Sequence, residues 1–187
     1  MNASPPPDEW FKLGPFTVYD TETTGMSPTG DRIVEIAAVR VGADGERTTF
    51  HSLVNPGRPI PSPLSAIHGI TDEMVSVAPA FCEVAPLFLA FAADSTLVAH
   101  NARFDLSFLQ ESLFREGLET WSGKTLDTIR LMKMAYPGME SYSLGALRKA
   151  FALDDDAGPA HRAYADVQWT VDVLSFALRR LLNQQVL

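Results

Sequence analysis

Two acidic side chains follow the first apolar segment of the chain at a spacing that suits the binding of a cation. Residues 16–19 have the pattern of a short strand, and Asp20 and Glu22 come directly after it. If the strand continues through Glu22, both carboxylates point to one face of a sheet. Side by side they repel each other unless a cation lies between them. The alternative is a strand that runs out into solvent, where acids are common.

Two further segments place an acidic residue at the start of a helix. Asp105 follows the short apolar segment 96–99 and lies in the first turn of the next helical pattern. Asp166 opens the last helical pattern, and His161 precedes it by five residues. Five residues turn a regular helix by about 140°, so the two cooperate only if His161 lies in the loop after Pro159. Taken singly, Asp105 is explained by the helix dipole and His161 by a surface loop.

The segments that must position these residues have strand and helix patterns, and these patterns predict an α/β domain with a mixed sheet. Segments 16–19, 33–41 and 47–54 read as strands joined by short turns, which favours an antiparallel meander. Beyond them, helical patterns alternate with the short strand 96–99. The expected helices lie at 79–93, 104–113, 125–136, 143–151 and 166–182, the last with an apolar stripe of Val167, Val171, Leu174, Leu178 and Leu181.

The expected domain organisation is a disordered leader at 1–13 and a single domain at 14–187. Three consecutive prolines at 5–7 disfavour a helix or a central strand in the leader. The sequence shows no signal-peptide pattern and no apolar run long enough to cross a bilayer. We therefore expect a cytoplasmic protein without membrane contact.

Composition limits the classes of function. The 187 residues include 15 Lys and Arg against 23 Asp and Glu, a formal net charge of -8. This balance argues against a protein that coats long duplexes through a broad basic face, but not against an enzyme that grips a few nucleotides. Cys82 is the only cysteine, so an intrachain disulfide and a four-thiolate zinc site are excluded.

The three acidic segments, in this order and at this spacing, resemble the DnaQ-like family of 3′–5′ exonucleases, in its DEDDh subgroup. Asp20 and Glu22 match the first motif of the family, Asp105 the second, and His161 with Asp166 the third. The resemblance covers roughly residues 16–182. Other segments that look like family segments lie at 20–25, 67–71, 100–105, 126–128 and 141–144.

The resemblance implies a ribonuclease H-like fold, with a mixed five-stranded sheet whose first three strands are antiparallel and with helices on both faces. It also implies two divalent cations, Mg²⁺ or Mn²⁺, held by Asp20, Glu22, Asp105 and Asp166. Hard cations prefer carboxylate oxygens, and two of them stabilise the attacking and leaving oxygens of phosphodiester hydrolysis. His161 would be the general base, since an ordinary pKa near 6.5 suits that task at neutral pH.

Contacts to the substrate are expected beside these ligands. Met26, where relatives often carry leucine, and Ile67 resemble a hydrophobic wedge at the last two bases. Phe104 could stack on a terminal base. Core packing of Phe104 and Ile67, and a capping or loop role for His68, are the alternatives. The expected polar contacts to the terminal nucleotide come from Thr23, Thr24, His68 and Asn101.

Three functions remain open at this point. The leading one is an exonuclease that releases nucleoside 5′-monophosphates from single-stranded DNA 3′ ends, as in proofreading or repair. The second is an exoribonuclease that trims RNA or degrades short oligonucleotides. The third is a binding subunit that stabilises a DNA polymerase partner. All five catalytic residue types are present, which disfavours a function in binding alone, and the short sequence after the last helix disfavours an obligate polymerase partner. The sequence indicates no oligomeric state.

Overall fold

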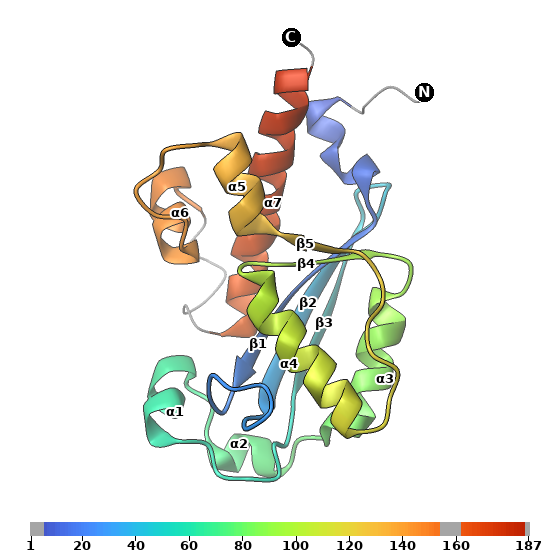
Figure 1. Ribbon diagram of the computed structural model, residues 1–187, viewed down its shortest axis with the longest axis vertical. Helices are drawn as coiled ribbons and strands as arrows, with labels where there is room; N and C mark the ends of the chain where they lie inside the picture. The colour runs from blue at the N-terminus through green and yellow to red at the C-terminus, as the bar shows by residue number, and fades with distance from the viewer. Residues whose placement is uncertain (1–5, 154–161, 186–187) are drawn as a thin grey trace.

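The computed structural model describes residues 6–153 and 162–185 (Figure 1). Within them, five strands form one sheet in the order β3-β2-β1-β4-β5. Neighbours among the first three strands are antiparallel, and β4 and β5 extend the sheet in parallel from β1. The expected mixed sheet is therefore confirmed. Its strands are β1 (Phe16–Thr23), β2 (Ile33–Val41), β3 (Arg47–Leu53), β4 (Thr96–Ala99) and β5 (Thr125–Asp127).

Helices cover both faces of this sheet, and each face has its own apolar core. One core lies between the sheet and the group of α5, α6, α7 and η1, and the other lies between the sheet and α3 with α4 (Figure 1). None of the helices in the described residues is both long and apolar enough to cross a membrane. The helices are η1 (Pro7–Leu13), α1 (Ser62–His68), α2 (Asp72–Ser76), α3 (Phe81–Ala92), α4 (Ala102–Arg115), α5 (Thr128–Ala135), α6 (Leu144–Phe151) and α7 (Ala163–Gln185).

Alternation along β1 decides which side chains face α7. Val18 belongs to the core under α7, whereas Tyr19 belongs to the core under α3 and α4. Asp20 and Glu22 lie two and four residues beyond Val18 and therefore share the face of α7, as expected. The apolar stripe of α7 is buried against the same face, which holds the helix over the end of β1.

The expected disordered leader is wrong for residues 7–13, which form the 3₁₀ helix η1. Trp10 is 5% exposed and stacks on Phe16, with ring centroids 6.0 Å apart. Asp8 pairs with Arg179 of α7. Proline is tolerated in the first turn of a helix, where its missing N–H has no partner to lose, so the prolines do not prevent η1. Residues 1–5 lie outside the described residues.

The expected helix at 125–136 also needs correction, because its first three residues form β5. This short strand pairs with β4 in parallel, with Leu126 opposite Val98. Asp127 then acts as N-cap: its Oδ1 accepts a hydrogen bond from the N–H of Ile129 at 2.8 Å. Helix α5 therefore begins at Thr128.

Candidate active site

Three carboxylates meet where the end of β1 lies close to the first turn of α7. Asp20, Glu22 and Asp166 each offer one oxygen, and these oxygens all lie within 4.8 Å of one another. The strand supplies the first two, and the helix supplies the third. The structure thus brings together three of the predicted site residues. An all-oxygen set of this span fits a hard divalent cation such as Mg²⁺ or Mn²⁺.

Asp105 lies next to this cluster, in the first turn of α4. The backbone N–H and the hydroxyl of Thr21 both donate to its Oδ1, at 3.0 and 2.8 Å. The Asp105 side chain is nearly fully buried, and these two bonds fix its orientation against the middle of the strand segment that carries Asp20 and Glu22. The role of Thr21 was not predicted, because nothing in its position along the strand indicates its partner.

The electrostatics of the cluster show how strongly the acids affect one another. Burial raises the pKa of Asp20 well above its ordinary value, and the charges of Asp105 and Glu22 raise it further. Burial and the nearby charge of Asp166 raise the pKa of Glu22 to about 8. Burial also raises the pKa of Asp105 to about 7, against the lowering effect of its bonds from Thr21. A bound cation would relieve this repulsion, so the residues present fit a metal site.

Glu35 is a fifth acid at this site, it is fully buried, and it was not among the predicted residues. It lies directly opposite Glu22 in the β1–β2 pairing. Its carboxylate accepts hydrogen bonds from Arg162 Nη2 at 2.9 Å and from the N–H of Ala163 at 3.0 Å, and it contacts His51 Nε2 at 2.8 Å. A lone acid inside the otherwise apolar run at 33–39 was the available signal.

The partners of Glu35 give it the opposite electrostatic character to Glu22. Burial alone would raise its pKa, but the hydrogen bonds from His51, Arg162 and Ala163 outweigh burial and lower the pKa to about 2. Glu35 therefore stays ionised at neutral pH. It ties β2 to the start of α7, three residues before Asp166, and so fixes the part of the helix that completes the cluster.

We expect Glu35→Ala to lower the free energy of unfolding by about 2–3 kcal/mol, because it leaves the Arg162 charge without its buried partner. Partial exposure of Arg162 keeps this loss below that of a fully buried pair. Glu35→Gln should lose less, since the amide retains an acceptor oxygen. Urea denaturation measures both, with Glu46→Ala, an exposed acid in the β2–β3 turn, as the control. Equal stability of the Glu35→Ala and Glu46→Ala proteins would contradict the role of Glu35 in holding the start of α7 to β2.

The three apolar residues predicted to contact substrate differ in exposure. Met26 is 76% exposed and Ile67 is 54% exposed, so core packing of Ile67 is wrong. Phe104 is half-buried, and its ring packs against Phe108 with centroids 4.9 Å apart. Phe104 therefore belongs partly to the core under α4, while Met26 and Ile67 are available for an apolar partner.

The four predicted polar contacts are placed in different ways. The Thr23 hydroxyl donates to the carbonyl of Gly25 at 2.6 Å, and this side chain is buried. His68 is 3% exposed, and its Nδ1 accepts from the N–H of Ile70 at 3.0 Å, which is the loop role considered as the alternative. Asn101 is exposed and is the N-cap that precedes α4, in the left-handed conformation with φ of 69°. His161, the predicted general base, lies outside the described residues.

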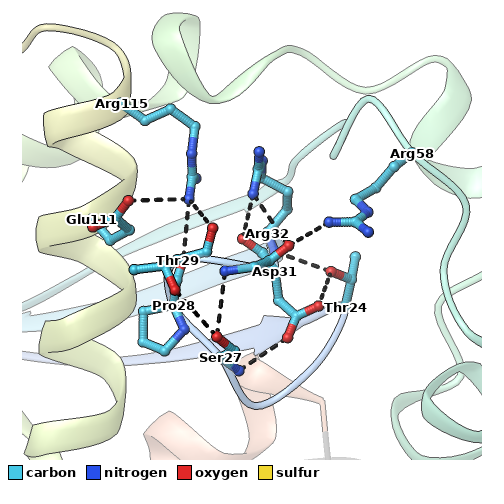
Figure 2. A network of polar contacts seen from close by, with 10 residues as sticks. Thr24, Ser27, Pro28, Thr29, Asp31, Arg32, Arg58, Glu111 and Arg115 are labelled. Atoms are coloured by element: carbon cyan, nitrogen blue, oxygen red, sulfur yellow. Dashed lines mark hydrogen bonds and ion pairs between the residues drawn. The ribbon is translucent and has the colours of Figure 1, made fainter.

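Thr24, the fourth predicted polar contact, belongs to a hydrogen-bonded loop at residues 24–32 that carries Met26 (Figure 2). Asp31 is central to it: its Oδ2 accepts from the N–H of Ser27 at 2.9 Å, and its Oδ1 accepts from the Thr24 hydroxyl at 3.4 Å. The Thr24 hydroxyl in turn accepts from the N–H of Arg32 at 3.0 Å. The hydroxyl of Thr24 thus holds the loop together, and the loop presents Met26 from a fixed backbone.

Comparison with known proteins places this geometry among nucleases. A sequence model of the exonuclease family (RNase T) matches residues 17–174. The DNA polymerase III subunit epsilon of Treponema pallidum is 38% identical over 162 residues, which are 86% of this chain and 74% of that protein. A DNA polymerase III subunit epsilon-like protein of Rhodobacter capsulatus is 44% identical over 161 residues, 84% of this chain, but the chain spans only 23% of that relative's length.

A solved structure agrees with these sequence relatives. Exonuclease X, in complex with 5′ overhanging duplex DNA, is 33% identical and superimposes with a TM-score of 0.66 over 91% of this chain and 92% of that one. The order and direction of the strands, together with this likeness, confirm the ribonuclease H-like fold expected from the sequence.

Proposed function

The chain belongs to the exonuclease family, in its DnaQ-like 3′–5′ branch, and from this membership we propose that it degrades single-stranded DNA from the 3′ end and releases nucleoside 5′-monophosphates. One observation carries the proposal to the level of residues. The oxygens of Asp20, Glu22 and Asp166 lie within 4.8 Å of one another at the end of β1, where burial and the charges of neighbouring acids raise the pKa values of Asp20 and Glu22.

We propose two divalent cations, Mg²⁺ or Mn²⁺, as cofactors. Asp20, Glu22 and Asp166 would hold one of them, and Asp20 with Asp105 would hold the second. When bound, such cations stabilise the negative charge that develops on the attacking and leaving oxygens of a phosphodiester. The protein's contribution is to hold the carboxylates in place: Thr21 orients Asp105, and Glu35 fixes the start of α7.

The remaining roles belong to side chains around the acids. His161 would accept the proton of the attacking water, since it precedes Asp166 closely in the sequence and histidine titrates near neutral pH. Met26 and Ile67, both exposed, would contact the last two bases. The half-buried ring of Phe104 would stack on a base with its exposed part. Thr23 would offer backbone groups and Thr24 its backbone carbonyl, because both hydroxyls and the Thr24 N–H already bond within the loop.

The names of the relatives favour DNA over RNA. Exonuclease X is bound to a DNA duplex with a 5′ overhang, and the Treponema relative is a DNA polymerase III subunit. The second name also supports a DNA polymerase as partner, which is the second candidate role. An exoribonuclease function is the alternative, and the experiment must distinguish it from cleavage of DNA.

Digestion of matched, 5′-labelled DNA and RNA oligonucleotides tests the proposal. We expect a ladder that shortens one nucleotide at a time from the 3′ end in Mg²⁺ or Mn²⁺, DNA to be degraded faster than RNA, and no cleavage in EDTA. A strand blocked by a 3′-phosphate is the control for end recognition. Cleavage that starts at internal positions, or that persists in EDTA, contradicts the exonuclease proposal, and faster cleavage of RNA contradicts the choice of substrate.

A further inference from the structure

Three arginine side chains from separate parts of the chain converge on the loop at residues 24–32 (Figure 2). Arg32 ends the loop, Arg58 comes from the connection between β3 and α1, and Arg115 comes from the last turn of α4. All three guanidinium groups bond to backbone carbonyl oxygens of the loop. These oxygens belong to Pro28, at 3.0 Å from Arg115 Nη2, to Asp31, at 2.9 Å from Arg32 Nη1, and to Gly30, which is the partner of Arg58.

Arg32 and Arg58 bond to neutral carbonyl oxygens, and these bonds do not cancel the charge of their guanidinium groups. The Asp31 carboxylate accepts from the N–H of Ser27 and is therefore directed into the loop. Arg115 also forms an ion pair with Glu111, at 3.5 Å between Nη2 and Oε1. Burial lowers the pKa of Arg32, and the charges of Arg115 and Arg58 lower it further. Three arginines thus lie together at this loop, with Asp31 and Glu111 beside them.

Two of these arginines line a cavity of about 210 Å³. Arg32 and Arg115 share its wall with polar residues and one acid, and with apolar residues: Asn55, Ser112 and Glu116 on the one hand, and Ile33, Val54, Pro56, Ala80 and Phe81 on the other. A guanidinium group offers five N–H donors in a planar fork, more than the loop carbonyls use, and this fork matches the paired oxygens of a phosphate. The two guanidinium groups in the wall of the cavity therefore suit a phosphate group.

The cavity lies close to the acid cluster along the same strand and loop. Arg32 is hydrogen-bonded to Thr24 in both directions, at 2.8 and 3.0 Å, and Thr24 follows Glu22 by two residues. A strand advances about 3.3 Å per residue, so Arg32 lies within a few nucleotide spacings of the acids. We propose that Arg32, Arg58 and Arg115 bind a backbone phosphate of the nucleic acid whose 3′ end lies at the acids, an inference that rests on the proposed exonuclease function.

The test compares long and short substrates in Arg58→Gln and Arg115→Gln proteins. We expect the ratio of kcat/KM for a 20-nucleotide DNA to kcat/KM for a trinucleotide to fall about tenfold, through KM. The slope of log(kcat/KM) against log salt concentration for the 20-nucleotide DNA should become shallower by about 0.7 for each phosphate that the variant no longer binds. Arg47→Gln removes the same charge at the opposite end of the sheet and should change neither quantity.

Two further experiments, one with another variant and one with another substrate, test how the arginines act and which strand they bind. Arg58→Lys keeps the charge and should retain the salt slope, which separates phosphate binding from support of the loop by the guanidinium fork. A duplex with a 5′ overhang tests the source of the phosphate: a fall in activity with single strands assigns the substrate strand, and a fall confined to the duplex assigns the complementary strand. Equal falls for the 20-nucleotide DNA and the trinucleotide, or salt slopes equal to that of Arg47→Gln, would overturn the inference. Cleavage of the trinucleotide by the wild-type protein shows separately whether the proposed function holds.

Discussion

Replacing Asp20 by asparagine should reduce metal-dependent cleavage by about 10³-fold or more, because several kcal/mol of charge stabilisation are lost with one cation ligand. The same change should raise the melting temperature of the protein in EDTA. Burial and the charges of neighbouring acids raise the pKa of Asp20, so an uncharged amide of the same shape removes repulsion from the folded state. Steady-state kinetics and thermal unfolding measure the two opposite effects.

Two comparison variants isolate the cause of this effect. Asp94→Asn makes the same chemical change at an exposed residue with φ of 58°, a left-handed conformation that asparagine also adopts, and should alter neither activity nor stability. His161→Ala should reduce cleavage by about 10²- to 10⁴-fold and leave the rise in melting temperature with Mn²⁺ unchanged. If Asp20→Asn retained cleavage and destabilised the protein in EDTA, Asp20 would be a structural acid and the assignment of the site would be wrong.

The second large effect is a dependence of stability on pH that a divalent cation should reverse. The pKa values of Glu22 and Asp105 rise to about 8 and about 7 on folding, so between their unfolded pKa values near 4 and these folded values the folded state holds more protons. The stabilisation that these extra bound protons give the folded state is present below about pH 4 and is lost as the pH rises to about 8. In EDTA we therefore expect the melting temperature to fall by about 5 °C or more between pH 5 and pH 8.

Mn²⁺ should restore this stability, and most strongly at pH 8. Binding to the folded state alone at a hundred times the dissociation constant stabilises it by about 2.7 kcal/mol, and the ionised carboxylates that bind metal predominate at high pH. Calorimetry across pH with EDTA or Mn²⁺ measures both trends. Asp20→Asn should show a shallower fall in EDTA and a smaller response to Mn²⁺. A melting temperature in EDTA that rose steadily from pH 5 to pH 8 would contradict the raised pKa values.

The sequence predicted the parts of the site that follow from local periodicity. Alternation along β1 placed Asp20 and Glu22 on one face, and the apolar stripe of α7 placed Asp166 at the start of that helix; the structure confirms both placements. Local patterns also indicated the three antiparallel strands β1, β2 and β3. These features depend only on residues that are near one another in the chain.

What the sequence did not predict depends on contacts between distant segments. The only signal for Glu35 in the sequence is an acid within an apolar strand. Its partner Arg162 comes from the opposite end of the domain sequence. The burial of Trp10 requires α7, which the proline-rich start does not indicate. Strand β5 is three residues long, which is too short to show an alternating pattern. It joins the sheet because its backbone pairs in parallel with the edge of β4.

The split of the acid cluster between β1 and α7 has a consequence for the nascent chain. Domains form as their sequence emerges from the ribosome, and long-range contacts must wait for their last member. β1 and its acids emerge early, whereas Asp166 and the Arg162 clamp on Glu35 come after all five strands. A ribosome-bound chain that has exposed only residues 1–153 therefore has all five strand segments but an incomplete cation site. We expect such a chain to be unable to attack nucleic acid close to the ribosome, and the enzyme to become competent only when α7 docks.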